Sequence, residues 1–87
     1  MITLYQIYDL AGKTIVGPIM AVNHEAAAIR HFTDLLKAKD NLIGQHPDDF
    51  ELRELGHQDD NGTIDPLSEP RSALTGSAWL ATQAPST

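Results

Sequence analysis

The chain has 87 residues, the size of one small domain, which excludes a barrel enzyme or a full nucleotide-binding fold. It carries 12 Asp and Glu against 6 Lys and Arg, a formal charge of −6 at neutral pH. Because an acidic chain repels phosphate, a strong sequence-independent nucleic-acid binder is disfavoured unless the few cations are clustered. Cysteine is absent, so disulfides, thiol catalysis and thiolate metal sites are excluded.

No segment approaches the roughly 18 consecutive apolar residues of a membrane span. The first residues lack a basic stretch followed by an apolar run, so we expect no secretory signal and no membrane association. The expected location is the cytoplasm of the cell that makes the protein. Apolar residues make up 41% of the chain, which is typical of a folded globular domain.

The N-terminal quarter predicts extended structure. β-Branched and aromatic residues dominate Ile2–Asp9, and neither face of this segment is cleanly polar. This predicts a strand that is central in a sheet or covered on both sides. Ala11-Gly12-Lys13 supplies a turn. Thr14–Val16 resumes strand character, Gly17-Pro18 interrupts it, and Ile19–Val22 continues as a second short piece. Since proline cannot donate to a ladder, we expect this region to form an edge or a bulge.

One helix is predicted over residues 23–38. Asn23 is a suitable N-cap, because its side chain can accept a hydrogen bond from a free helical N–H. Glu25 near the start and Lys37 and Lys39 near the end suit the helix dipole. Apolar residues recur at helical spacing and form one buried stripe, which consists of Ala28, Ile29, Phe32, Leu35 and Leu36.

The segment after this helix is ambiguous. Leu42-Ile43 is compatible with one helical turn that Gly44 ends. Phe50–Arg53 alternates between apolar and charged residues, which predicts a half-buried strand. Leu55 breaks the alternation, and this indicates a bulge near Arg53-Glu54.

The C-terminal part begins with a hairpin signal. Asn61-Gly62 is the strongest short hairpin pattern, and Thr63–Leu67 is the predicted returning strand. We expect the folded unit to end at Pro70. Residues 71–87 are rich in Ser, Thr, Ala and Pro and predict an extended tail. The apolar Ala78-Trp79-Leu80 within it suggests docking, for example on a neighbouring subunit.

The predicted order is therefore β-β-α-β-β, an α+β domain over residues 1–70 followed by a tail over residues 71–87. One small antiparallel sheet packed on one helix is the natural arrangement of these elements.

Motifs that would carry chemistry are weak. Residues 57–68 partly match a calcium loop, but His57 occupies its first ligand position and Ser68 the position that needs a bidentate Glu. His24 and His31 share one side of the predicted helix and could help bind zinc, although a solvated helix face is the simpler interpretation. No serine lies in a glycine-framed elbow. We therefore expect no enzyme, no catalytic residue, no metal and no cofactor.

Binding is the remaining kind of function. Aromatic and basic side chains could stack on bases or anchor a protein partner, and a sheet that presents tyrosines can bind single strands. The candidates are Tyr5, Tyr8, Lys13, Arg30, Arg53 and Trp79. The alternative is that Tyr5 or Tyr8 fills the core. The charge of −6 weakens the nucleic-acid version and leaves a protein partner open.

An ordered series of segments carries a family resemblance. The series is Tyr5-Gln6-Ile7-Tyr8-Asp9, Gly17-Pro18, Asn23, Ala28-Ile29-Arg30-His31-Phe32, His46-Pro47-Asp48-Asp49-Phe50-Glu51-Leu52, Leu55-Gly56 and Asp59–Gly62. Over residues 1–70 the chain resembles the small nonstructural protein of gokushovirus-type microviruses, which are single-stranded DNA phages. The segment around Trp79 is not part of the resemblance.

The resemblance implies an accessory protein of phage replication in the host cell cytoplasm. The family looks like a counterpart of the C protein of phiX-type phages, which helps to switch duplex replication to single-strand synthesis coupled to packaging. The implied partners are a replication initiator, a host helicase or procapsid proteins, and no site residues are carried over. Two alternatives stay open, a single-stranded DNA-binding protein and a structural homo-oligomer.

Overall fold

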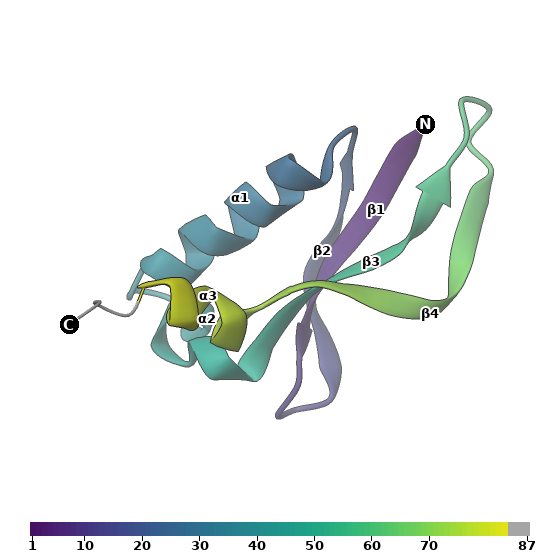
Figure 1. Cartoon of the computed structure of the whole chain (residues 1–87). Coiled ribbons are helices and arrows are strands. Elements are labelled where there is room, and N and C mark those ends of the chain that lie inside the picture. Colours follow the sequence, from purple (N-terminus) through teal and green to yellow (C-terminus); the bar gives the residue numbers. More distant parts are fainter. Residues whose placement is uncertain (84–87) are drawn as a thin grey trace.

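The computed structural model describes residues 1–83, which form a four-stranded antiparallel sheet in the order β2-β1-β3-β4 with helices at one end (Figure 1). The strands are β1 (Ile2–Asp9), β2 (Thr14–Val22), β3 (Phe50–Gln58) and β4 (Ile64–Thr75), and the helices are α1 (Glu25–Lys37), α2 (Leu42–Gln45) and α3 (Gly76–Gln83), with a 3₁₀ turn at Pro47–Asp49. The α+β class is confirmed. The predicted β-β-α-β-β order is wrong in detail, because α2, the 3₁₀ turn and α3 add to it.

The core lies between the sheet and the helices. Helix α1 buries Ala28, Phe32 and Leu36 completely, which confirms the apolar stripe predicted for it. Their partners on the sheet include Ile7 and Leu52 from the two central strands, as predicted for Ile2–Asp9. Packing on a single helix is not what the structure shows, since α2 and α3 also contribute side chains to this core.

Helix α1 begins one or two residues later than predicted. Its N-cap is His24, and no side chain caps it, so the expected capping role of Asn23 is wrong. Asn23 lies one residue too early for its side chain to be the cap. The backbone N–H of Ala27 instead donates to the carbonyl of His24 over 3.1 Å. Glu25 in the first turn is acidic, as the helix dipole favours.

The ambiguous segment after α1 is helical. Asn41 caps α2, because its side-chain oxygen accepts a hydrogen bond of 3.0 Å from the Gly44 N–H. Ile43 turns inward and is 8% exposed, whereas Leu42 is 60% exposed. Gly44 lies inside the helix and does not end it. Glycine suits this position because the backbone carbonyl of Ala38 lies where a Cβ would be.

Irregular pairing follows the glycines and prolines of the strands. Strand β2 continues through Gly17-Pro18 as an edge strand, with a register shift and a positive φ of 77° at Gly17. The predicted edge position is confirmed, and the predicted interruption is an irregularity within one strand. In the pairing of β1 with β3, Leu55 is the extra residue. This bulge lies one residue after the predicted Arg53-Glu54.

Strand β4 runs past the predicted domain end at Pro70. The hairpin before it is confirmed, with the Asp59 N–H donating to the Thr63 carbonyl over 2.9 Å. Pro66 pairs with Gly56 and Arg71 with Glu54, so the extra residues between them bulge out of the ladder. An edge strand tolerates prolines because one side needs no ladder hydrogen bonds.

The predicted tail after Pro70 is therefore mostly ordered. Residues up to Thr75 belong to β4, and α3 follows directly. A Cβ on Gly76 would lie 1.7 Å from the Pro47 carbonyl oxygen, so glycine lets α3 approach the 3₁₀ turn closely. Trp79 packs against the core of its own chain, whereas docking on a neighbouring subunit was suggested. The last part of the predicted tail, residues 84–87, lies outside the described residues.

The molecule is elongated, with principal extents of 49 × 26 × 23 Å. Its Cα radius of gyration is 13.6 Å, against roughly 12 Å for a compact chain of this length. The β3–β4 hairpin causes much of the extension, since it projects from the sheet on the side away from α2 and α3 (Figure 1). No helix among residues 1–83 is long and apolar enough to cross a membrane.

Candidate interaction surface

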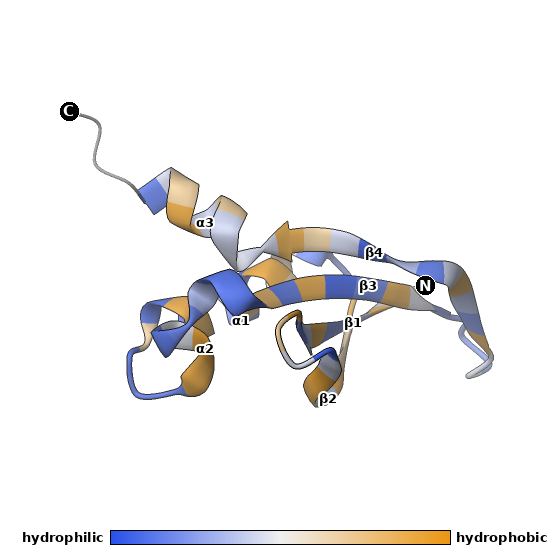
Figure 2. Cartoon of the chain, turned by 90° about the horizontal axis from the view of Figure 1, so that it is seen from below, coloured by the Kyte–Doolittle hydropathy of each residue, from blue (hydrophilic) through white to orange (hydrophobic). Residues whose placement is uncertain are grey.

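The two faces of the sheet differ in what covers them. Alternate residues of a strand point to opposite faces, and the orange and blue bands along β3 in Figure 2 follow this alternation. Tyr5, Ile7 and Leu52 point to the helices and belong to the core cluster. The other face carries Gln6, Tyr8, Ile15, Glu51, Arg53 and Ser72 at paired register positions, and we call these six residues the open face. None of them belongs to the core cluster, although Gln6 and Glu51 are themselves buried, at 7% and 9% exposed.

Tyr5 lies on the covered face. Its side chain is part of the core, and the residue is 2% exposed. The phenol hydroxyl donates a hydrogen bond of 2.8 Å to Oε1 of Glu25 in the first turn of α1. Burial, with a smaller contribution from the Glu25 carboxylate, raises the pKa of Tyr5 to about 12. The alternative that a tyrosine fills the core therefore holds for Tyr5, and its ring is not available for stacking on a ligand.

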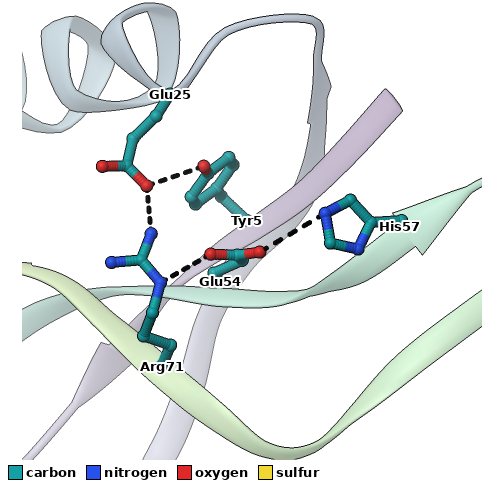
Figure 3. A network of polar contacts seen from close by, with 5 residues as sticks. All are labelled: Tyr5, Glu25, Glu54, His57 and Arg71. Carbon is teal, nitrogen blue, oxygen red and sulfur yellow. Dashed lines mark hydrogen bonds and ion pairs between the residues drawn. The ribbon is translucent and has the colours of Figure 1, made fainter. Parts of the chain in front are cut away.

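A polar network closes the edge of the core beside Tyr5 (Figure 3). Arg71 of β4 donates to Oε1 of Glu54 over 2.6 Å and also to Glu25. On the other side of Glu54, Nε2 of His57 lies 3.6 Å from Oε2. The hydrogen bond to Glu54 is the largest of the effects that raise the pKa of the Arg71 guanidinium. Arg71 therefore ties the edge strand β4 to both β3 and α1.

This network was not predicted from the sequence. Glu54 is 9% exposed and needs a cationic partner, but the predicted domain end at Pro70 placed Arg71 in the tail. A buried acidic residue at an apolar position of a strand was the available signal, because such a group is kept ionised only when it is paired. Glu54 is the buried member of the network, with a side chain 12% exposed, whereas the Arg71 side chain is 50% exposed. The network ties the fold together at the rim of the core.

The open face brings two of the predicted residues together. The guanidinium carbon of Arg53 lies 3.7 Å from the centre of the Tyr8 ring, within the range of a cation–π contact. Nε of Arg53 also donates to Oε1 of Glu51 on the same strand. Gln6, the register partner of Arg53 on β1, donates a hydrogen bond of 2.8 Å from its side-chain amide to the Gly17 carbonyl. These contacts hold an aromatic ring and a planar cation in a fixed arrangement.

The charges of the open face balance. Arg53 contributes one positive charge, and Glu51 contributes one negative charge to the same ion pair. Both side chains are mostly buried, 28% exposed for Arg53 and 11% for Glu51. Among the six residues of the open face these two alone are charged. Such a surface is mixed apolar and polar, and it lacks the excess of cations that phosphate contacts require.

The other predicted residues lie elsewhere. Lys13 is exposed in the turn between β1 and β2, with a positive φ of 56°, near the end of β1 that carries Tyr8. Arg30 is exposed on α1. Trp79 is half-buried in α3 against the core. The six candidates therefore do not form one site, and the pair Tyr8–Arg53 is the part that the structure assembles.

The histidines give no metal site in the described part of the chain. His24 and His31 are exposed, and among residues 1–83 no three His, Asp or Glu side chains are placed to hold a metal ion. The residues that partly matched a calcium loop form the β3–β4 hairpin instead. Asp59, Asp60 and Asn61 line a depression there together with Met1.

The fold and this surface define a small α+β domain whose sheet is covered on one face by helices. The chain matches the family model described as Phage ORF5 protein over residues 2–79, and it belongs to this family. The match extends past Pro70 into α3, in agreement with the structure. Neither the curated proteins nor the solved structures include a significant match. The chain is thus a phage protein.

Proposed function

We propose that this chain is a non-enzymatic accessory protein of a gokushovirus-type microvirus, a counterpart of the phiX-type C protein. In this proposal it acts in the host cell cytoplasm, in genome replication, the switch to single-strand synthesis and packaging. It acts through protein partners, namely the replication initiator, a host helicase or procapsid proteins. The family membership supports a phage accessory role, and the resemblance described above supplies the finer assignment.

The open face is the observation that supports binding to a protein partner. Tyrosine and arginine are enriched where protein interfaces gain most of their binding energy, and Tyr8 and Arg53 lie in direct contact there. The ion pair of Arg53 with Glu51 leaves this surface neutral. A neutral surface on a chain of charge −6 suits a protein partner better than a phosphate backbone.

Binding to each purified candidate partner tests the proposal. The chain is immobilised and exposed in turn to the initiator, the helicase and procapsids, with the wild type compared with Tyr8→Ala and Arg53→Ala. We expect at least one partner to bind, and each substitution to weaken that binding about tenfold, as expected for truncation of a central interface residue.

Arg30→Ala is the matched control, because Arg30 is an exposed arginine on α1 away from the open face. It should leave the affinity unchanged. If none of the three partners binds the wild type, the protein-partner reading is wrong. Equal losses for Arg30→Ala and Arg53→Ala would remove the open face from it.

A single-stranded DNA-binding function is the second candidate, and the Tyr8–Arg53 stack favours it. Bases stack on aromatic rings and on guanidinium planes, and the exposed Lys13 lies at the same end of β1. The test is fluorescence anisotropy of a labelled oligo-dT at low and moderate salt. Micromolar binding that weakens with salt and with Tyr8→Ala supports this function. No binding at low salt excludes it.

A further inference from the structure

The two edges of the sheet differ in how they are protected from other strands. Strand β4 carries Asp65, Glu69 and Arg71, together with Pro66 and Pro70, and its pairing is irregular. Charges, prolines and bulges are the usual features that keep an edge strand from pairing with another chain. This edge is therefore blocked.

The β2 edge has a proline and an irregularity in its middle, but it lacks the charges that protect β4. Thr14–Val22 contains no Asp, Glu, Lys or Arg, and among the four strands of residues 1–83 it alone is uncharged. Its blocking features, Pro18 and the irregular pairing beside Gly17, are confined to the middle of the strand. Ile15 is 61% exposed and Ile19 is 53% exposed. Figure 2 shows the orange colour of apolar residues on β2. An uncharged apolar edge of nine residues, roughly 30 Å long, would be a liability if it stayed unpaired.

We propose that the β2 edge is an interface with a second copy of this chain. Two β2 strands related by a two-fold axis would pair antiparallel and join the two sheets into one of eight strands. The inference does not depend on the proposed function, because it rests on the uncharged edge strand and not on the Tyr8–Arg53 pair. Ile15 is the one residue that the edge shares with the open face. A structural homo-oligomer was one of the alternatives that the sequence left open. In this proposal that oligomer is a dimer formed through β2.

The charge distribution favours a second copy as the occupant. Two chains of charge −6 repel each other, so a self-contact is tolerated best where the surface has no charge. The β2 strand is such a surface, and pairing it buries no ionised side chain. Because the same strand would lie on both sides of the axis, an apolar segment meets an apolar segment.

The shape of the monomer supports the same conclusion. A chain of 87 residues has a small core, and this one is more extended than a compact chain of its length. Pairing through β2 satisfies backbone groups at the edge and covers part of Ile15 and Ile19. The open faces of the two copies would become continuous. One surface of the dimer would then carry two Tyr8–Arg53 pairs, one from each copy.

Sedimentation velocity over a concentration series tests the dimer, with the full chain and two matched variants. Ile19→Lys places a charge on the β2 edge. Ile64→Lys places the same charge at a residue of similar exposure, 57%, on β4. We expect a wild-type dimer at micromolar concentration, a dissociation constant raised about tenfold or more by Ile19→Lys, and no change with Ile64→Lys. Circular dichroism confirms that both variants fold.

Hydrogen exchange identifies which surface forms the contact. If β2 pairs with its copy, amides of Thr14–Val22 gain protection as the concentration rises, and amides of β4 do not. A wild type that remains a monomer at about 100 µM, where a dimer with a micromolar dissociation constant would be formed, overturns the proposal. A dimer whose β2 amides stay unprotected, or which both lysine variants weaken equally, overturns it as well.

Discussion

The Tyr5 hydroxyl donates a hydrogen bond of 2.8 Å to Glu25, which joins the central strand to the first turn of α1. The contact spans 20 positions in the sequence and lies at the boundary of the core. It fixes where the helix begins over the sheet, since the N-cap of α1 makes no side-chain hydrogen bond of its own. The same carboxylate also accepts from Arg71, so one acidic residue anchors two strands to the helix.

Removal of the hydroxyl should weaken the fold moderately. Tyr5→Phe keeps the ring in the core and deletes one hydrogen bond to a charged acceptor, which contributes about 1.5–3 kcal/mol. We expect a loss at the lower end, about 1.5 kcal/mol, because Glu25 keeps its contact with Arg71. Urea unfolding measures the difference. Tyr8→Phe is the control, since no hydrogen bond of the Tyr8 hydroxyl is present in the described structure, and an equal loss for both variants would contradict the role of the Tyr5–Glu25 bond.

Alkaline pH should destabilise the protein through the same tyrosine. The folded state raises the pKa of Tyr5 from 10.0 to about 12, so the folded chain holds a proton that the unfolded chain releases. This stabilisation is complete below pH 10 and is lost as the pH rises toward 12. The loss should be about 1–3 kcal/mol in the free energy of unfolding.

The pH effect is isolated by comparison with Tyr5→Phe, which cannot lose this proton. The difference in unfolding free energy between the wild type and the variant should shrink from pH 9 to pH 12. A difference that stays constant over this range would show that Tyr5 titrates alike in the folded and unfolded chains.

Arg71 should contribute more than an ordinary surface arginine. Arg71→Ala leaves the Glu54 carboxylate, whose side chain is 12% exposed, with only the His57 contact. We expect a loss of about 1–2 kcal/mol, limited because half of the Arg71 side chain is exposed and screened by solvent. Arg30→Ala, at an exposed position on α1, should change stability by less than about 0.5 kcal/mol.

A double substitution separates the unpaired charge from lost packing. Glu54→Gln removes the charge that Arg71→Ala leaves without its partner. The two losses should therefore not add, and the double variant should be more stable than their sum predicts. Additive losses in thermal unfolding would show that Arg71 acts through packing and not through Glu54.

Much of the fold could be predicted because its signals are local. The helical spacing of Phe32 and Leu36 gave the buried stripe of α1, and Asn61-Gly62 gave the hairpin. The edge position of β2 followed from Pro18, whose missing N–H excludes a central strand.

The errors arose where tertiary contacts outweigh local signals. Pro70 was interpreted as the end of the domain, but an edge strand with a bulge accommodates it. Helix α3 has little amphipathic pattern, so residues 76–83 looked like a tail. What holds this helix is the close approach of Gly76 to Pro47 and the packing of Trp79, and both depend on residues distant in the sequence.

The candidate site could be predicted only in part for the same reason. Tyr8 and Arg53 were named from residue type, but their contact depends on the register of β1 with β3. Tyr5 was grouped with them, although alternation along the strand places it on the opposite face. The Arg71–Glu25 contact spans 46 positions and could not be inferred from spacing.

For the substitution Gly76→Ala, the docking of α3 and helix propensity predict opposite changes in stability. Within a helix, Gly→Ala ordinarily stabilises by about 1 kcal/mol. At Gly76 the added Cβ would overlap the Pro47 carbonyl oxygen, so α3 has to move away from the 3₁₀ turn. We expect Gly76→Ala to destabilise by about 2 kcal/mol or more. Trp79 is the single tryptophan of the chain and is half-buried. Because Gly76→Ala would move α3 away from the core and expose Trp79 to water, the tryptophan emission of this variant should shift to longer wavelength. Ser77→Ala, at the next and exposed position, should leave both properties unchanged; stabilisation by Gly76→Ala without a spectral shift would show that α3 does not dock there.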